Sequence, residues 1–473
     1  MKNLVLPILL GYISMTAYAQ KSKSEVIEDL DSKSAEYAAI AKKIWGFAEV
    51  GFQETQSSAL LQETLTKNGF KIEAGVAGMP TAFVASYGTG KPVIAILGEY
   101  DALPGVAQQA VPEKRTIEGQ RAGHACGHHL FGTASSAAAI AVKQWLIANK
   151  RPGTIRFYGT PAEEGGSGKV YMVREGLFKD VDAVINWHPG PVNSASPGTS
   201  LANKTGKFRF YGVASHAAAA PHRGRSALDG VEAMDAMVNM MREHVTPETR
   251  LHYVITRGGE APNVVPAFAE VYYYVRHPDR AEVKSVWDRI VNAANGAALG
   301  TDTKVEVEIT GGVHDLLPNE TLSKAMFENL KQIGGFTMTD EEMKFGTEIQ
   351  KTFTGRVPPM TSTQEIAGYQ LRAGSASTDV GDVSWIVPTV GMSAATWVPG
   401  TAAHSWQAVA AGGTSIGMKG MMVAAKSMSL TAIDLFSNPT LLNDAWKEFK
   451  EKTAGYQYEA LIGDRPPALD YRN

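Results

Sequence analysis

The chain has 473 residues, of which 44% are hydrophobic and 20% charged, and its formal net charge is −3 at pH 7. This composition is that of a globular protein with a large core, and the length favours two or more domains of roughly 100–200 residues each. A small negative charge without a long basic tract gives no reason to expect nucleic acid or an anionic membrane surface as partner.

The first 19 residues have the pattern of a secretory signal peptide. A short basic start precedes an apolar run over 4–13, and Ala17-Tyr18-Ala19 is an A-x-A cleavage pattern. A short membrane anchor is the alternative, but the apolar run falls short of the ~20 residues that cross a bilayer. No later stretch is expected to cross one. We therefore expect an exported protein, periplasmic or secreted, that is cleaved after Ala19.

The remaining chain predicts an α/β catalytic domain in two parts, 20–203 and 314–473, with a small domain inserted at 204–313. Two amphipathic helices are expected between Ser24 and Asn68, and strands then alternate with helices. This rhythm predicts a mostly parallel sheet with helices on both faces. The expected strands are 91–99, 153–159 and 182–187, and the expected helices are 133–148 and 168–175.

The inserted segment changes to an antiparallel pattern. Its expected strands are 204–213, 250–256, 269–276 and 304–310, and its expected helices are 227–244 and 282–299. Two helices and four strands in this order predict a small α+β sandwich of the ferredoxin-like type. Because its edge strand and helices could pair with a second copy, we expect a lid that also forms a homodimer contact. After residue 319 α/β features return, ending in a helix over 412–436.

Side chains that divalent metals accept occur in four distant pieces of the chain, several of them at the ends of predicted strands. They are Cys126 and His128, the pair Glu163 and Glu164, His188, and His404. Thiolate, imidazole and carboxylate groups are ligands of zinc and manganese. The carboxyl ends of parallel strands form the ligand-binding edge of an α/β sheet, and Asp101 also follows such a strand. The pattern predicts a two-metal hydrolytic site.

The adjacent carboxylates predict a proton carrier beside the ligands. In a loop, neighbouring side chains can point in different directions, so one carboxylate can bind metal while the other faces the substrate. Two metals ~3.5–4 Å apart lower the pKa of a shared water, and a free carboxylate can pass its proton to the leaving amine. We assign Glu163 as this general base and Glu164 as a ligand, and the sequence alone leaves the converse open.

Six segments, taken in order, resemble the M20 family of metallopeptidases and amidohydrolases. They are GEYDALPG, GHACGHHLFG, GTPAEEGG, NWHPG, GVASHAAAAPHRGRSALDG and APNVVPAFAEVYYYVR. The Cys-Gly-His motif is similar to the family's aminoacylase, hippuricase and auxin-conjugate hydrolase branch. A further segment, STDVGDVSW at 377–385, resembles the B-subunit group of the p-aminobenzoyl-glutamate hydrolases.

The resemblance implies two divalent ions per subunit, Mn or Zn or possibly Co, with Glu163 as the base. Cys126 would take the place of the bridging carboxylate of the peptidases, and Asp101 would orient a ligand imidazole. The implied ligands are Cys126, His128, Glu164, His188 and His404.

The remaining implied residues lie in or near the inserted domain and the Cys-Gly-His motif. His216 would reach the site of a dimer partner and stabilise the developing oxyanion. Asn263 and Arg276 would contact the substrate, because a guanidinium suits a carboxylate, although Arg276 could instead form an ordinary ion pair. His129 stands where many members of the branch have Asp, so it either supports a ligand from behind or contributes one.

These features predict an amidohydrolase that cleaves the amide bond of N-acyl amino acids. The expected substrates are aryl-acyl amino acids such as p-aminobenzoyl-glutamate. A dipeptidase or general aminoacylase of the same fold is the alternative. Two further hypotheses are an amidase with Cys126 as nucleophile, activated by His128 or His124, and a binding protein without catalysis. A second, different subunit is also open, because the group that the chain resembles is named as one of two subunits.

Overall fold

A six-stranded sheet in the order β1-β2-β6-β3-β7-β12 forms the centre of the computed structural model, which describes residues 20–472. The predicted signal peptide lies outside the described residues. β6, β3, β7 and β12 are parallel, whereas β2 runs antiparallel to β6 and β1 antiparallel to β2. The strands are β1 Lys71–Ala74, β2 Phe83–Thr89, β3 Val93–Gly98, β6 Gly153–Gly159, β7 Ala183–Gly190 and β12 Thr389–Ala395, with a small separate pair β4 Leu103–Pro104 and β5 Ala122–Gly123.

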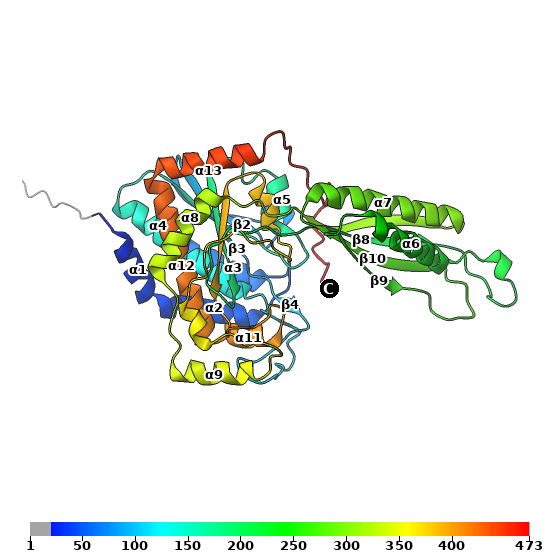
Figure 1. Ribbon diagram of the computed structural model, residues 1–473, viewed down its shortest axis with the longest axis horizontal. Coiled ribbons are helices and arrows are strands. Elements are labelled where there is room, and N and C mark those ends of the chain that lie inside the picture. Colours follow the sequence, from blue (N-terminus) through cyan, green and yellow to red (C-terminus); the bar gives the residue numbers. More distant parts are fainter. Residues whose placement is uncertain (1–19, 473) are drawn as a thin grey trace, which may run out of the picture.

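Helices cover both faces of this sheet (Figure 1). Every residue of β3 is buried, and its side chains alternate between two cores: Ile94 and Ile96 face one, Ala95 and Leu97 the other. This is why the strand is apolar throughout. The helices are α1 Lys23–Ser32, α2 Ser34–Phe47, α3 Thr55–Lys67, α4 His128–Ala148, α5 Gly168–Arg174, α8 Glu320–Ile333, α9 Asp340–Gln350, α10 Val380–Ser384, α11 Trp406–Gly412, α12 Ser415–Ser437 and α13 Pro439–Lys452.

The sequence predictions for the first part of the chain need three corrections. The segment between Ser24 and Asn68 forms three helices, because a left-handed residue, Ala48, ends α2 before α3 begins. The two antiparallel strands β1 and β2 were missed. α4 begins at His128, five residues earlier than expected, and its interior Gly132 is needed because a Cβ there would lie 2.7 Å from the carbonyl oxygen of Glu99.

The expectation that no later stretch is apolar enough to cross a bilayer is also corrected by α4. By length and composition this helix passes such a test, the single one to do so among residues 20–472, but 83% of its apolar window is buried inside the protein. α4 packs between the sheet and α12 and is a core helix.

The inserted unit is a four-stranded antiparallel sheet in the order β11-β8-β10-β9, with α6 and α7 packed against it. Its elements are β8 Ala202–Tyr211, α6 Ala227–Met241, β9 Arg250–Arg257, β10 Phe268–His277, α7 Arg280–Gly300 and β11 Lys304–Val313. The unit projects from the catalytic part (Figure 1). Its βαββαβ order and the mostly parallel main sheet confirm the predicted fold class, an α/β domain with an inserted ferredoxin-like domain.

After α13 the chain turns back to the junction of the two units and ends there (Figure 1). Leu461 packs into the core of the inserted unit, and the next residue, Ile462, packs into the core on one face of the main sheet. The C-terminal segment therefore contacts both units.

Candidate metal centre

A tight turn places Cys126 and His128 at the start of α4. Gly127 between them has φ 79°, in the left-handed region that favours glycine. A Cβ there would also lie 2.6 Å from the side chain of Pro189, the residue after His188. The turn predicted from the Cys-Gly-His spacing therefore exists, and its glycine allows the end of β7 to approach closely.

The structure brings all five predicted ligands together, in two groups whose candidate ligand atoms lie within 4.8 Å of one another. One group is Cys126, His128 and His188, and the other is Cys126, Glu164 and His404. Cys126 belongs to both groups, and its Sγ lies 3.4 Å from Nε2 of His188. A thiolate shared between two ligand groups can bridge two metal ions.

The imidazoles of the first group are held in the tautomer that metal binding needs. His128 donates from Nδ1 to Asp101 Oδ1 over 2.8 Å, and His188 donates from Nδ1 to the carbonyl of Pro189 over 2.7 Å. Each ring then presents its bare Nε2 to the cluster. Asp101 Oδ2 also accepts the backbone N–H of Glu164 at 2.9 Å, so one carboxylate orients two candidate ligands.

His404 approaches from a different part of the chain. Its φ of 60° is strained for a residue with a Cβ, and its backbone N–H donates to the carbonyl of Ala125, next to Cys126, over 3.0 Å. Nε2 lies 3.3 Å from Glu164 Oε1, and 56% of the side chain is exposed. The strained backbone thus aims a partly solvated imidazole at the cluster.

Several buried polar atoms of the cluster lack well-aligned hydrogen bonds, as expected of a metal centre. Within the described chain, His128 Nε2 and Glu99 Oε2 lie 3.0 Å apart, and Glu164 Oε1 lies 3.3 Å from His404 Nε2, but none of these three buried atoms makes a well-aligned hydrogen bond. A buried polar atom left unpaired costs about 1–3 kcal/mol, and cations commonly satisfy such atoms. Burial raises the pKa of the Cys126 thiol well above its usual value, so the thiolate needs a nearby cation. The donor set of N, O and S atoms therefore fits two divalent ions.

Sequence reasoning missed a fully buried ion-pair cluster beside these ligands. Lys169 Nζ lies 2.6 Å from Glu99 Oε1 and 2.7 Å from Asp379 Oδ1, and all three side chains are at most 1% exposed. Glu99 Oε2 in turn lies 3.0 Å from His128 Nε2. Asp379 belongs to the STDVGDVSW segment, which could have indicated its importance, whereas Lys169 on α5 carries no sequence signal.

The paired glutamates occupy different environments. Burial and the nearby Glu99 carboxylate raise the pKa of Glu163 well above its usual value. Burial also acts on Glu164, but the imidazoles of His404 and His128 outweigh it, and the pKa of Glu164 is lowered. Glu163 groups with Glu99 and His128. The pair is therefore split between two chemical settings: the ionised form of Glu164 is favoured, as a ligand needs, and the proton affinity of Glu163 is increased, as a proton carrier needs.

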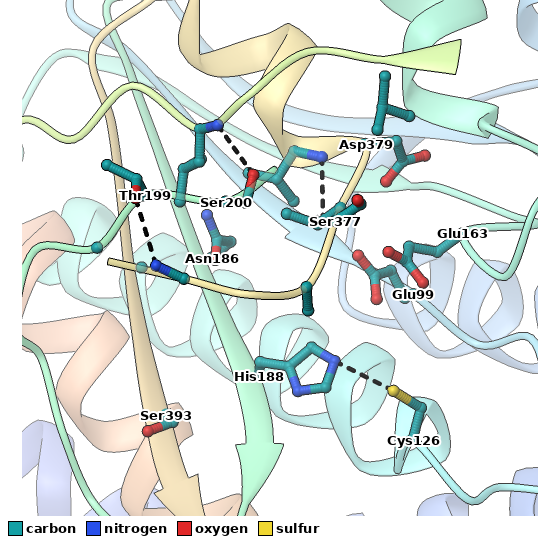
Figure 2. Close-up of a pocket in the computed structure, with 18 of the residues that line it drawn as sticks. Glu99, Cys126, Glu163, Asn186, His188, Thr199, Ser200, Ser377, Asp379 and Ser393 are labelled. Carbon is teal, nitrogen blue, oxygen red and sulfur yellow. Dashed lines mark hydrogen bonds between the residues drawn. The ribbon is translucent and has the colours of Figure 1, made fainter. Parts of the chain in front are cut away.

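A cavity of about 750 Å³ opens in front of the cluster. Figure 2 shows Cys126, His188 and Glu163 on one side and Thr199 on the other. Arg276 of β10, in the inserted unit, also lines this cavity. It forms no ion pair with any carboxylate of residues 20–472, and its guanidinium lies 5.6 Å from the centre of the Tyr274 ring. The ordinary ion-pair role considered for Arg276 is therefore absent from the described chain.

Three of the predicted site residues lie elsewhere. His216 and Asn263 are not among the residues that line the cavity; the backbone N–H of Ala217 donates to the carbonyl of Asn263 over 3.0 Å. His129 is buried, donates from Nε2 to the carbonyl of Gly412 over 3.0 Å and packs against His124. It belongs to none of the ligand groups, so of the two roles considered for His129 the supporting one fits better than that of a ligand.

Known proteins are similar to this chain in both sequence and fold. The chain is 42% identical to the B-subunit of p-aminobenzoyl-glutamate hydrolase from Escherichia coli K12, over 92% of this chain and 96% of that protein. It is 30% identical to the Xaa-Arg dipeptidase of Mus musculus over 93% of this chain and 94% of the relative. These identities extend over both parts of the catalytic domain and the insertion.

Solved structures agree in fold. An aminobenzoyl-glutamate utilization protein from Klebsiella pneumoniae superposes with a TM-score of 0.63 at 18% identity, covering 87% of this chain and 98% of that one. A dinuclear metal-binding M20 peptidase from Bacillus subtilis has a TM-score of 0.59 at 16% identity, covering 86% and 99%. The model of peptidase family M20/M25/M40 matches residues 95–377. The family predicted from the motifs is thus confirmed: the chain belongs to peptidase family M20/M25/M40.

Proposed function

We propose that the chain is a dinuclear metal-dependent amidohydrolase that cleaves N-acyl amino acids, with p-aminobenzoyl-glutamate as its first candidate substrate. One observation carries this proposal: five candidate ligands converge in two groups that share Cys126, with the carboxyl of Glu163 beside them. The name of the Escherichia coli relative supports the choice of substrate.

Two divalent ions, held by Cys126, His128, Glu164, His188 and His404, would supply Lewis acidity and lower the pKa of a water. Glu163 takes a proton from the attacking water as the water oxygen bonds to the amide carbon. The same carboxyl then delivers this proton to the leaving nitrogen as the C–N bond breaks. Asp101 fixes the orientation of the His128 ring and of the Glu164 backbone through its two hydrogen bonds. The ligand set of thiolate, imidazole and carboxylate suits Mn, Zn or Co.

Arg276 is proposed to bind the free carboxylate of the amino-acid half of the substrate. It lines the same cavity as the cluster, and its guanidinium is free of carboxylate partners among the described residues. A guanidinium can pair with a carboxylate through two parallel hydrogen bonds. This contact would select substrates that end in a free carboxylate.

A homodimer would explain the places of His216 and Asn263. In one chain both lie outside the cavity, whereas the inserted unit of a second copy could present them to it. The edge strand β9 supports this pairing, because Val254 is 55% and Ile255 40% exposed on a strand with one free edge. We also propose export through the predicted signal peptide, and a second, different subunit stays open because two relatives are named as different subunits of one hydrolase.

The hypothesis of a cysteine nucleophile fits less well. His124 Nε2 is bonded to the carbonyl of Ile44. His128 lies beside Cys126, but a nucleophile–base pair leaves the convergence of Glu164 and His404 on the same thiol unexplained. Burial keeps the thiol protonated at neutral pH when no cation is near, and a thiol is a weaker nucleophile than a thiolate.

The test of the substrate class is a panel assay with the mature protein loaded with Mn or Zn. Release of amino acid is measured from p-aminobenzoyl-glutamate, hippurate and a dipeptide that ends in arginine. The proposal expects the aryl-acyl amino acids to have the highest kcat/KM. A clear preference for the dipeptide would favour the dipeptidase alternative, and inertness towards the whole panel would contradict the proposal.

A further inference from the structure

The last described residues of the chain contact the backbone of a candidate metal ligand. Tyr471 donates from its hydroxyl to the carbonyl oxygen of Glu164 over 2.9 Å. Arg472 donates from Nη2 to the same oxygen over 2.6 Å. From this geometry we infer that Tyr471 and Arg472 form a positioning clamp, which fixes the loop that carries Glu163 and Glu164.

The clamp adds to other hydrogen bonds that hold the same loop. On the other side of the same residue, the N–H of Glu164 donates to Asp101 Oδ2 over 2.9 Å, and the N–H of Ala162 donates to Glu54 over 2.8 Å. The next two residues are both glycines, and Gly165 has φ 90°, so the backbone beyond Glu164 has little intrinsic preference. The carbonyls of Ala162 and Glu163 accept the N–H groups of Gly166 and Gly165 within the loop, and the tail holds the carbonyl of Glu164.

The side chain of Tyr471 packs into a site formed by Gly51 and Phe52. Its ring packs edge-on against the buried ring of Phe52, with centroids 5.6 Å apart. A Cβ at the neighbouring Gly51 would lie 2.2 Å from the Tyr471 hydroxyl oxygen. The absence of a side chain at position 51 is what lets the hydroxyl reach the loop.

The segment that carries the clamp is anchored on both units. Arg465 donates to the carbonyl of Ile309 in β11 over 2.6 Å, and Glu459 pairs with Lys284 of α7 at 2.7 Å. From the catalytic part, Arg174 donates to the carbonyl of Arg465 over 2.8 Å. A tail held in this way limits where Tyr471 and Arg472 can lie, so the clamp is preorganised.

The test compares the double variant Tyr471→Phe/Arg472→Gln with a matched control, Tyr158→Phe/Arg289→Gln. In the control, Tyr158 loses a part-buried hydroxyl bond to the Leu177 carbonyl, and Arg289 loses a bond to the His244 carbonyl; neither bond involves a residue of the loop. Cobalt affinity is measured by titration, together with the visible spectrum of the bound cobalt and its thiolate charge-transfer band. Both readouts are independent of substrate.

The clamp variant should bind cobalt about 10- to 100-fold more weakly than the control, as happens when groups that orient ligands are lost, and its cobalt spectrum should shift. Wild-type cobalt affinity and spectrum in the clamp variant would overturn the inference, as would equal changes in the control.

A second test measures kcat and KM, and it rests on the proposed function. With p-aminobenzoyl-glutamate, kcat should fall about 10- to 100-fold, the cost of a misplaced catalytic group, while KM changes little. A raised KM with unchanged kcat and cobalt spectrum would make Arg472 a substrate contact instead and refute the clamp. If the wild type cleaves no N-acyl amino acid but the cobalt results are as expected, the proposed function fails and the clamp stands.

Discussion

Replacing Lys169 with methionine tests whether the buried ion-pair cluster supports the metal centre. Lys169 and its partners Glu99 and Asp379 are at most 1% exposed, with N–O distances of 2.6 and 2.7 Å. Methionine keeps much of the volume but removes the charge. Two carboxylates then remain buried without their cation, and breaking such a pair costs about 3–5 kcal/mol.

The loss of stability caused by Lys169→Met should increase as the pH rises. Burial already raises the pKa of Asp379 to about 6, although Lys169 acts to lower it. Without Lys169 that folded-state pKa rises further above its unfolded value. The folded variant then holds a proton that the unfolded chain releases, so stability falls as the pH rises through this window. The loss should be smaller near about pH 5 than near about pH 8, since protonation neutralises the buried carboxyl at the lower pH.

Urea unfolding of the metal-free protein at both pH values measures these differences. Lys331→Met is the control, because Lys331 forms an exposed pair with Glu328 at 3.1 Å, which should contribute under about 1 kcal/mol. A loss for Lys169→Met no larger than that of the control, or one that does not grow with pH, would refute this reasoning.

Four further variants test the proposed roles. Glu163→Gln should keep both metals but lower kcat about 10²–10⁴-fold; near wild-type turnover would remove its role as base. His404→Ala should weaken metal binding measured by titration, and unchanged affinity would contradict its role as ligand. Arg276→Ala should raise KM for substrates with a free carboxylate but not for their methyl esters; an equal effect on both would exclude a carboxylate contact. In the metal-free protein, Glu54→Gln should flatten the fall of stability between about pH 5 and 8. Burial and Asp101 raise the pKa of Glu54 to about 8, so in this range the folded protein keeps a proton that the unfolded chain has released; an unchanged slope would show that Glu54 is already ionised in the folded protein.

The predictable part of the fold follows from local pattern. β6 was predicted at its observed ends, because both faces of this strand are largely buried and its residues other than Arg156 are apolar, aromatic or small. The ferredoxin-like insertion followed from alternation in its strands. The start of α4 could not be predicted, since Gly132 in the first turns is unfavourable for a helix until β3 is seen to approach it.

The candidate ligands were predictable because each lies in a short motif with its own spacing. Lys169 was not, because a lysine on a helix is expected at the surface, and its burial depends on Asp379, 210 residues further along the chain. Tyr471 and Arg472 gave no signal either, since their contact with Glu164 joins residues more than 300 positions apart. Long-range contacts of this kind exist only after the chain has folded.

Release of p-aminobenzoate from p-aminobenzoyl-glutamate by the metal-stripped mature protein, before and after Mn or Zn is added back, tests the central claim most directly. The account predicts no release without metal and recovery that reaches its maximum at two ions per chain. Release that persists in the stripped protein, or no release with two ions demonstrably bound, would contradict it.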